Sequence, residues 1–249
     1  MDVQLSAASE PASPAPALQS LSGERAPDAL VASFLAAGRT ILLKRGQELL
    51  PAGGGDSDAF MLVDGRLKVE LLSPDGGAII IREVVPVRLV GELAAIDDQP
   101  RSAGLTALVP SRLVRLPADQ FRCLILGNPE HAAWALRHLA ALARALTAQV
   151  YALSFLPVRA RLHCELHRLA RDAGAGDGTA TLFEAPTHEE LAQRIGSHRE
   201  AISREMAALA RLGLLSQRRR RLVIHDAATL AAMAAAALGE GGGRTGPHG

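Results

Sequence analysis

Between residues 40 and 116, apolar positions fall in short runs separated by turns rich in glycine and proline. Such runs are typical of β-strands. They cover residues 41–43, 59–63, 67–72, 78–85 and 112–116. Asp64-Gly65, between two of these runs, favours a tight hairpin. Many short strands at regular spacing predict an antiparallel jelly roll or β-roll. We assign it to residues 28–128, with short helices over 27–38 and 117–126.

Residues 129–155 keep a helical pattern throughout. Apolar residues recur in it close to heptad a and d positions: Leu139, Ala143, Leu146, Val150 and Leu153. A narrow seam of this kind is typical of a helix–helix contact between subunits, and symmetric dimers are the commonest oligomers. We therefore expect a dimerisation helix over 129–156. Packing of this helix onto the chain's own barrel is the alternative. Pro157 ends the helix and is a candidate hinge.

Further along, the pattern indicates two short helices joined by a glycine. Thr187 is a good N-cap, and Glu190 three residues later completes a capping box. Gly196 follows as a tight turn, and Ser197 with Glu200 forms a second capping-box pattern. Behind it, three apolar residues recur at helical spacing: Ile202, Met206 and Leu209. Two short helices around a glycine turn predict a helix-turn-helix.

The second of these helices is expected to enter the major groove of DNA. Arg199, Glu200 and Arg204 lie off the apolar stripe and near the N-terminus, where docked recognition helices meet base edges. Arginine can pair bidentately with guanine, and glutamate can accept from cytosine. In the alternative interpretation, Glu200 only closes the capping box and the arginines are solvated.

The same domain is expected to contain a basic wing. Two short apolar runs enclose Arg218–Arg221 and predict a β-hairpin whose four cations suit phosphate contact; a solvated basic turn is the alternative. We expect helices over 158–173 and 227–238, so that residues 157–238 form a winged helix-turn-helix domain. The complete architecture is α+β, with a β-roll, a long helix and this domain in sequence.

Charge supports this division of the chain. The 249 residues have a net charge of only +1, but residues 187–221 contain eight arginines against four glutamates. Residues 28–125 contain eleven basic against twelve acidic residues. A near-neutral front and a basic back suggest that only the back meets a polyanion.

Several features indicate a cytoplasmic protein with no membrane partner. Cys123 and Cys164 lie far apart without metal-ligand spacing, which favours a reducing compartment. No signal peptide is recognised, and residues 132–156 are interrupted by charges that make them a poor membrane span. Residues 1–27, rich in Ala, Pro and Ser, are expected to be a disordered lead. Residues 239–249 are expected to be a flexible tail.

One segment of the β-roll contains residues suited to an anionic ligand. A short helix beginning near Gly91 would present free backbone N–H groups. Arg101 could pair bidentately with a phosphate, and Ser102 could add a hydroxyl. Glu92 could accept hydrogen bonds from a ribose hydroxyl. The alternative is an internal salt bridge between Glu92 and Arg101.

From about Thr40 to Asp226, the chain resembles the CRP/FNR superfamily of bacterial transcription regulators, the catabolite activator protein group. Gly91-Glu92-Leu93, followed after seven residues by Arg101-Ser102-Ala103, is similar to that family's cyclic-nucleotide phosphate cassette. Phe155–Val158 stands where the family's hinge lies, and Ile195–Arg204 resembles its recognition helix.

The resemblance implies a homodimeric regulator with a cyclic nucleotide effector, cyclic AMP or cyclic GMP, and no metal. Glu92 would bind the ribose 2′-hydroxyl, while Arg101 and Ser102 would hold the cyclic phosphate. Backbone donors would come from Gly91, Glu92, Leu93, Ala94 and Ala103.

On the DNA side, the resemblance implies that Arg199, Glu200 and Arg204 read TGTGA-like half-sites of a palindromic double-stranded operator. His188 occupies a phosphate-contacting position. The remaining DNA-binding candidates are Thr187, Ser197, His198, Ser203, Arg218, Arg219, Arg220 and Arg221. RNA polymerase is a further expected partner.

Three departures from the family pattern concern the effector. Leu146 stands where cyclic-AMP-responsive members have a threonine that meets the adenine, whereas Thr147 keeps a hydroxyl that in the family can reach the partner subunit's ligand. The choice between adenine and guanine is therefore open. Val87-Arg88 replaces the usual Gly-Asp before the cassette, so that turn is expected to differ. Neither the cysteine cluster of the oxygen-sensing branch nor a haem-binding His/Cys pair is recognised.

Two rival functions belong to other classes. One is a ligand-independent DNA-binding regulator whose β-roll is vestigial or differently liganded. The other is an enzyme with a cupin-like barrel, which needs histidine and carboxylate metal ligands inside the barrel. Residues 40–116 contain no histidine, so we do not expect an enzyme.

Overall fold

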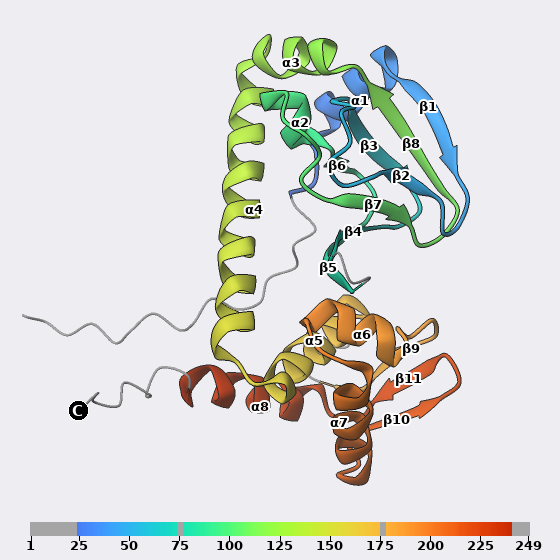
Figure 1. Cartoon of the computed structure of the whole chain (residues 1–249), viewed down its shortest axis with the longest axis vertical. Helices are drawn as coiled ribbons and strands as arrows, with labels where there is room; N and C mark the ends of the chain where they lie inside the picture. The colour runs from blue at the N-terminus through green and yellow to red at the C-terminus, as the bar shows by residue number, and fades with distance from the viewer. Residues whose placement is uncertain (1–23, 74–76, 175–177, 241–249) are drawn as a thin grey trace, which may run out of the picture.

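The structure is a computed structural model that describes residues 24–73, 77–174 and 178–240 (Figure 1). Most of the expected disordered lead, residues 1–23, lies outside the described residues. So do residues 241–249 of the expected flexible tail. The described chain forms a β-roll, a long helix beside it, and a smaller C-terminal domain at the far end of that helix (Figure 1).

The β-roll consists of two four-stranded antiparallel sheets, with the strand orders β1-β8-β3-β6 and β2-β7-β4-β5. The strands are β1 (Arg39–Leu43), β2 (Glu48–Leu50), β3 (Ala59–Asp64), β4 (Leu67–Leu72), β5 (Ala78–Val84), β6 (Arg88–Val90), β7 (Gly104–Ala107) and β8 (Ser111–Leu116). Apolar side chains of both sheets meet in one core, and this burial stabilises the pairing of such short strands. The predicted β-roll is confirmed, but β2, β6 and β7 were not predicted.

Four helices surround the β-roll: α1 (Asp28–Ala37), α2 (Glu92–Asp97), α3 (Ala118–Leu126) and α4 (Pro129–Phe155). Leu30 and Phe34 of α1 are fully buried. The ring of Phe34 meets that of Phe121 of α3 edge-on, with 6.2 Å between centroids. The helix predicted before the first strand is therefore part of the core of the β-roll domain.

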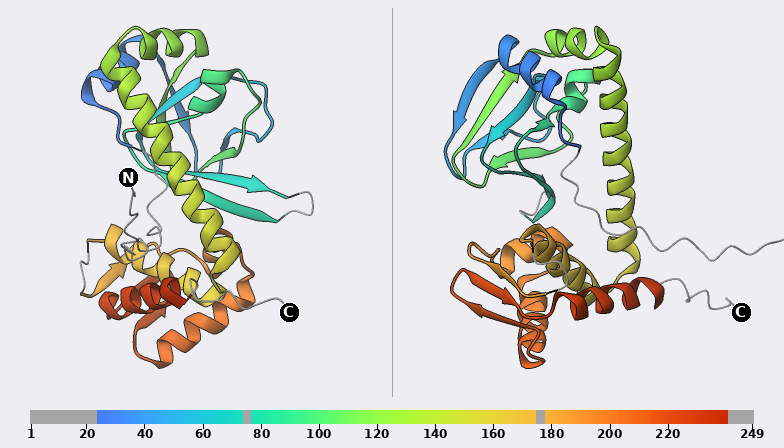
Figure 2. Two further views of the ribbon diagram at one scale, coloured as in Figure 1. Left: turned by 90° about the vertical axis from the view of Figure 1, so that its left-hand side faces the viewer. Right: turned by 180° about the vertical axis from the view of Figure 1, so that it is seen from behind.

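Helix α4 runs along one side of the β-roll and down to the C-terminal domain (Figures 1 and 2). Its first turn is well specified, because Asn128 caps it by accepting from the backbone N–H of Glu130 at 2.9 Å and Pro129 follows. Three of its residues, His131, Trp134 and His138, are buried. Trp134 shares a core with residues of α1, α3 and the β-roll strands.

Much of the predicted seam of α4 is exposed in the single chain. Leu146 is 44% exposed, Val150 63% and Leu153 37%; Leu136 and Phe155 of α4 are exposed as well. The alternative, in which the seam itself packs on the chain's own barrel, does not hold for these residues. Their exposure leaves an apolar stripe available to a second copy.

The C-terminal domain contains α5 (Val158–Asp172), β9 (Ala180–Leu182), α6 (His188–Ile195), α7 (Arg199–Arg211), β10 (Leu215–Arg218), β11 (Arg221–Ile224) and α8 (Ala227–Glu240). The strands form an antiparallel sheet in the order β10-β11-β9. Apolar residues of all these elements share one core. The predicted winged helix-turn-helix is confirmed. Strand β9 was not predicted, and α8 reaches two residues into the expected flexible tail.

Neither a membrane span nor a metal cluster is found among the described residues. None of their helices combines the length and the apolar character needed to cross a bilayer. Nor do they bring together three or more histidine, cysteine, aspartate or glutamate side chains in a way that could hold a metal ion.

Candidate functional site

At Gly91 the chain passes close to the backbone of Asp58 and to the guanidinium of Arg101. Gly91 precedes α2 in the left-handed conformation, with φ 76°. A β-carbon at this position would lie 2.7 Å from Nη1 of Arg101 and 3.0 Å from the backbone oxygen of Asp58. Only glycine combines this backbone conformation with the free space that the neighbours leave.

Arg101 is turned toward this loop, and its side chain is only 3% exposed. Nη1 donates to the backbone oxygen of Gly91 at 2.7 Å, and Nη2 donates to the oxygen of Asp58 at 2.6 Å. Nη2 also meets the carboxylate of Asp56 at 3.1 Å. An Arg101–Asp56 pair thus takes the place of the alternative internal salt bridge between Glu92 and Arg101. Nε of Arg101 has no hydrogen-bond partner within the described residues.

Glu92 opens α2, and its side chain is only 4% exposed. Oε1 lies 3.4 Å from Nη2 of Arg82, on β5, and 3.6 Å from Nε2 of His138, on α4. Burial by itself raises the pKa of the Glu92 carboxyl, but the neighbouring His138 ring and the charge of Arg82 outweigh this, and the pKa lies below its ordinary value. Glu92 is therefore an anion held between two nitrogen groups.

His138 is oriented by residues on both sides of it. Its ring stacks on Trp134, with 5.1 Å between centroids. The backbone N–H of Glu24 donates to Nδ1 of His138 at 3.2 Å, and Nε1 of Trp134 donates to the backbone oxygen of Arg25 at 3.0 Å. Because a backbone N–H can only donate, Nδ1 accepts and Nε2 carries the ring proton. That proton faces Glu92.

Residues 24–27, the last four of the expected disordered lead, make defined contacts. Ala26 is fully buried, and its N–H donates to the backbone oxygen of Val87 at 3.0 Å. Part of the segment expected to be a disordered lead therefore makes defined contacts with the folded chain. This segment bonds on one side to Val87 and on the other to Trp134 and His138 of α4.

Four buried polar atoms in this region have no hydrogen-bond partner among the described residues: Arg82 Nη1, Glu92 Oε2, Arg101 Nε and His138 Nε2. Buried polar groups in native proteins are normally bonded. Three of the four belong to side chains in mutual contact, and Arg101 is bonded to the residue before Glu92. The region therefore has both donor and acceptor capacity available for a polar ligand.

Sequence reasoning identified only part of this group. It selected Gly91, Glu92 and Arg101 from one segment, whereas Arg82 and His138 come from a strand and a helix that only the fold brings to Glu92. The other predicted ligand residues are arranged differently: Leu93 is 43% exposed, Ala94 is buried, Ser102 is exposed and Ala103 is half-buried. Leu146 and Thr147 lie on the exposed face of α4, and the Thr147 hydroxyl donates to the oxygen of Ala143 at 3.0 Å.

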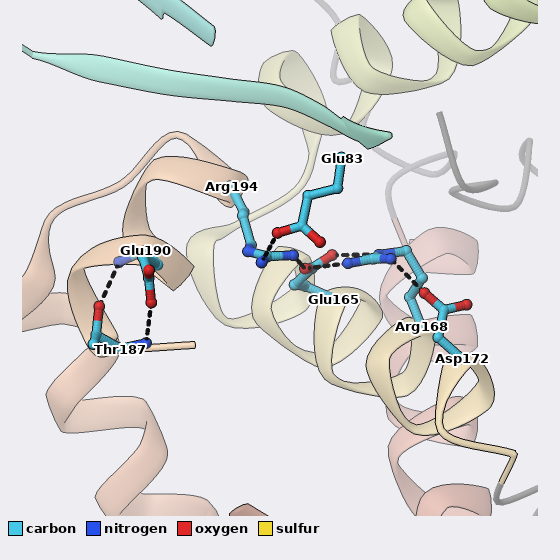
Figure 3. A network of polar contacts seen from close by, with 7 residues as sticks. All are labelled: Glu83, Glu165, Arg168, Asp172, Thr187, Glu190 and Arg194. Atoms are coloured by element: carbon cyan, nitrogen blue, oxygen red, sulfur yellow. Dashed lines mark hydrogen bonds and ion pairs between the residues drawn. The ribbon is translucent and has the colours of Figure 1, made fainter. Parts of the chain in front are cut away.

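The first helix of the helix-turn-helix begins as predicted. The Thr187 hydroxyl accepts from the N–H of Glu190 at 3.1 Å, and the Glu190 carboxylate accepts from the N–H of Thr187 at 2.6 Å (Figure 3). This is the predicted capping box. Gly196 ends the helix in the left-handed conformation, with φ 61°.

The second capping box is wrong. Helix α7 begins at Arg199, so its N-cap is His198, and no side-chain capping bond forms there within the described chain. Ser197 lies one residue too early to cap, and Glu200 occupies the second helical position rather than the third. Glu200 is exposed. Its carboxylate therefore closes no capping box.

Helix α7 has the amphipathic form that was predicted. Ile202, Met206 and Leu209 are buried, and Arg199, Glu200 and Arg204 are exposed. His188 of α6 contacts both α7 and β10. Its Nδ1 lies 2.9 Å from the Ser203 hydroxyl of α7, and its Nε2 lies 3.0 Å from Oε1 of Gln217 in β10. His188 thereby connects β10 with α7.

The wing presents its four arginines outward. Arg218 and Arg221 pair at the end of the β10–β11 hairpin, and all of Arg218–Arg221 are exposed. Arg219 takes a left-handed backbone, with φ 53°. The guanidinium of Arg221 lies 5.5 Å from the ring centroid of Phe183, a cation–π contact.

The junction between α4 and the C-terminal domain is held by one arginine. Pro157 separates α4 from α5 as predicted. Arg161 of α5 donates through Nη1 to the backbone oxygens of Leu153 at 3.1 Å and Leu156 at 3.4 Å. Its Nη2 donates to the oxygen of Gly196 at 3.1 Å. The end of the long helix is thus bonded to the turn that precedes α7.

Comparisons with known proteins agree with this geometry. Residues 40–128 match the cyclic nucleotide-binding domain, and residues 160–233 match the Crp-like helix-turn-helix domain. The chain is 28% identical over 188 residues to a "CRP-like cAMP-activated global transcriptional regulator" of Mycobacterium tuberculosis, covering 75% of this chain and 84% of that protein. It is 29% identical over 182 residues to the "cAMP-activated global transcriptional regulator CRP" of Pasteurella multocida, covering 71% and 85%.

A solved structure shows the same likeness. A CRP/FNR-family transcriptional regulator from Thermus thermophilus superposes with a TM-score of 0.64 at 27% identity, covering 79% of this chain and 98% of that one. The two matched domains are those of transcription regulators rather than enzymes, which rules out the cupin-like alternative. The β-roll and the winged helix-turn-helix agree with these relatives, and the chain belongs to the CRP/FNR superfamily of transcription regulators.

Proposed function

We propose that the chain is a homodimeric, cytoplasmic transcription regulator in which a cyclic nucleotide, cyclic AMP or cyclic GMP, bound in the β-roll changes the affinity for operator DNA. The observation that carries the proposal is the group of buried polar atoms without partners around Glu92, within the described residues. A carboxylate oxygen suits a ribose hydroxyl, and guanidinium nitrogens suit a phosphate. The relatives from M. tuberculosis and P. multocida are named as cAMP-activated, so cyclic AMP is the first ligand to test.

Binding requires a rearrangement at Arg101. Both of its terminal nitrogens are bonded to protein oxygens, so the cyclic phosphate would meet Nε or replace the partly exposed Asp56 carboxylate. Ser102 and the backbone N–H groups at the start of α2 would complete the phosphate site. The base would extend toward α4, where Leu146 and Thr147 are candidates for contacts within the dimer.

The exposed seam of α4 supports dimerisation. Two copies related by a twofold axis would bury the stripe that includes Leu146, Val150 and Leu153. Their recognition helices would then read half-sites about 34 Å apart, one turn of DNA. Arg199, Glu200 and Arg204 would meet base edges of TGTGA-like half-sites, whereas Arg218–Arg221 would contact phosphates. Such a dimer would present its remaining surface to RNA polymerase.

The test is a titration of the purified protein with cyclic AMP and cyclic GMP by calorimetry. Operator binding is measured in parallel without nucleotide and with each one. We expect saturable binding of at least one nucleotide and a changed operator affinity in its presence, since a ligand shifts an equilibrium only through differential affinity for its states. Binding of neither nucleotide would refute the proposal. Equal operator affinity in all three conditions would favour the ligand-independent regulator.

A further inference from the structure

Two consecutive residues of β5 contact two different functional parts of the molecule. Arg82 approaches Glu92 of the nucleotide cassette at 3.4 Å. Glu83 forms an ion pair with Arg194, on α6 of the helix-turn-helix. Adjacent side chains of a strand point to opposite faces, so one strand lies between the cassette and the DNA-binding domain. The side chains of Glu83 and Arg194 are 16% and 12% exposed.

A β-bulge sets the orientation of these two residues. In the β4–β5 ladder Glu70 pairs with Ile80, whereas its neighbour Val69 pairs with Arg82, so Ile81 is an extra residue on β5. A one-residue shift moves every following side chain to the other face of a strand. The bulge therefore places Arg82 toward Glu92 and Glu83 toward Arg194; bulges commonly re-aim side chains in this way next to functional sites.

The ion pair at Glu83 continues into the DNA-binding domain as a chain of charges (Figure 3). Nη1 of Arg194 donates to Glu165 of α5 at 3.2 Å. Arg168 meets the same carboxylate through two hydrogen bonds of 2.8 and 2.7 Å and reaches Asp172 at 2.7 Å. Arg194 lies in the last turn of α6, two residues before Gly196. A displacement of Arg194 would therefore act on the turn that leads into α7.

The contact between β5 and α6 lies next to open space. Clefts open beside it, one lined by Leu71 and Ile79 together with Gly196, and another lined by Arg45 and Lys68 together with Arg220. Glu83 and Arg194 both line the second of these clefts, and their side chains are partly buried. Removing one partner of a pair that is shielded from water leaves the other charge uncompensated, which is costlier than at an exposed pair.

We propose that Arg82 is an effector-binding residue and that β5 transmits its occupancy to the DNA-binding domain of the same protomer through Glu83 and Arg194. The inference rests on the proposed cyclic-nucleotide function and names the regulation of that site. Arg82 has a buried nitrogen, Nη1, that no described residue satisfies. A ligand that engages Arg82 and Glu92 displaces the backbone at residue 82, and Glu83 is the next residue. The route does not pass through the α4 seam or the Pro157 hinge.

The coupling can be measured as a single factor. If nucleotide changes operator affinity by some factor, operator DNA must change nucleotide affinity by the same factor, commonly about 5–150-fold. We therefore measure the nucleotide Kd by calorimetry with and without operator DNA, and take the ratio. The variants are Arg82→Gln, Glu83→Gln, Glu83→Asp and the double variant of Arg82→Gln with Glu83→Gln. Controls are Arg112→Gln on β8 and Glu48→Gln on β2, which are exposed.

Arg82→Gln is expected to weaken nucleotide binding by about tenfold or more, since it removes a charged donor from a buried site. Glu83→Gln is expected to bring the coupling factor several-fold closer to one. Glu83→Asp keeps the charge and is expected to retain most of the coupling. The double variant should lose no more coupling than Arg82→Gln alone, because both residues lie on one route. The controls should match the unmodified protein.

Two outcomes would overturn the inference while the proposed function stands: unchanged nucleotide affinity in Arg82→Gln, or an unchanged coupling factor in Glu83→Gln. Loss of coupling in Glu83→Asp equal to that in Glu83→Gln would also count against an ion-pair link. Failure of the unmodified protein to bind either nucleotide is a separate result, visible in the first titration, and would overturn both proposals. Thermal unfolding of each variant identifies any change that reflects misfolding.

Discussion

The backbone oxygen of Gly91 accepts a 2.7 Å hydrogen bond from Nη1 of Arg101, and a β-carbon on Gly91 would lie 2.7 Å from that same nitrogen. The backbone of Gly91 therefore binds the Arg101 guanidinium, and any side chain at position 91 would crowd it. Gly46 provides a matched comparison, because its φ is also positive, at 77°, but a β-carbon there would have no described atom within 4 Å.

Gly91→Ala should consequently destabilise the protein more than Gly46→Ala. Both variants require a left-handed alanine, which costs about 1–2 kcal/mol. Only Gly91→Ala also crowds Arg101 and Asp58, which adds about 1–3 kcal/mol as for other overpacked sites. Urea unfolding measures both differences. Equal losses in the two variants would mean that Arg101 moves away without cost.

Arg199→Ala should reduce binding to the operator more than binding to random DNA. An arginine paired with a guanine edge contributes about 1–3 kcal/mol of discrimination. Replacing Arg219 and Arg220 by alanine should instead weaken both kinds of DNA alike and flatten the dependence of log K on log salt. Titrations at several salt concentrations separate these effects. If Arg199→Ala weakened operator and random DNA equally, direct readout by this residue would be excluded.

Thr187→Ala and Ser197→Ala should differ in stability. Thr187 caps α6 through a complete capping box, so its replacement should cost about 1 kcal/mol. Ser197 lies outside α7, whose N-cap is His198, so its replacement should change the free energy of unfolding by less than about 0.5 kcal/mol. If Ser197→Ala lowered the free energy of unfolding as much as Thr187→Ala, Ser197 would be shown to cap α7 after all.

Acid stability should depend on Glu165. Burial raises the pKa of this carboxyl, but the hydrogen bonds and charges of Arg168 and Arg194 outweigh burial and hold the pKa below its ordinary value. The unfolded chain thus binds a proton more readily than the folded one, and the folded state loses this contribution as pH falls from about 4.3 through the lowered value. Above that range the contribution is fully present.

Glu165→Gln should therefore be less stable at neutral pH and should lose less additional stability on acidification. Urea unfolding at a series of pH values measures the slope. Glu189→Gln, at an exposed carboxylate of α6, serves as the control and should keep the slope of the unmodified protein. If Glu165→Gln showed the same dependence of the free energy of unfolding on pH as the unmodified protein, other carboxylates would determine the loss of stability in acid.

The sequence was most informative where a pattern is long or local. The 27 residues of α4 and the strands β4 and β5 were predicted almost to the residue. Strands β2, β6, β7 and β9 have only three or four residues, too few for a period to emerge. Ser197 matched a capping pattern, but the turn at Gly196 uses that residue as part of the loop, and tertiary geometry decided the start of α7.

The candidate site was predictable only as far as it is contiguous. The cassette from Gly91 to Ala103 is one segment and carries a recognisable motif. Arg82 had no signal beyond being one of two charged residues in an apolar strand, and its direction depends on a bulge that the sequence does not reveal. His138 looked only like an interruption of an apolar helix. Its role depends on stacking with Trp134 and on the N–H of Glu24, more than a hundred residues earlier in the chain.

The hydrogen bonds between residues 24–26 and α4 determine where a folded N-terminal fragment can begin. A fragment that started at residue 40, where the domain match begins, would leave His138 Nδ1 and Trp134 Nε1 buried without their described partners and would lack the α1 side chains that fill the core. In limited proteolysis, cleavage before Glu24 should leave the nucleotide domain intact. Cleavage just after Ala26 should release α4 from its place, so the smallest self-sufficient sensor is longer at its front end than the matched domain suggests.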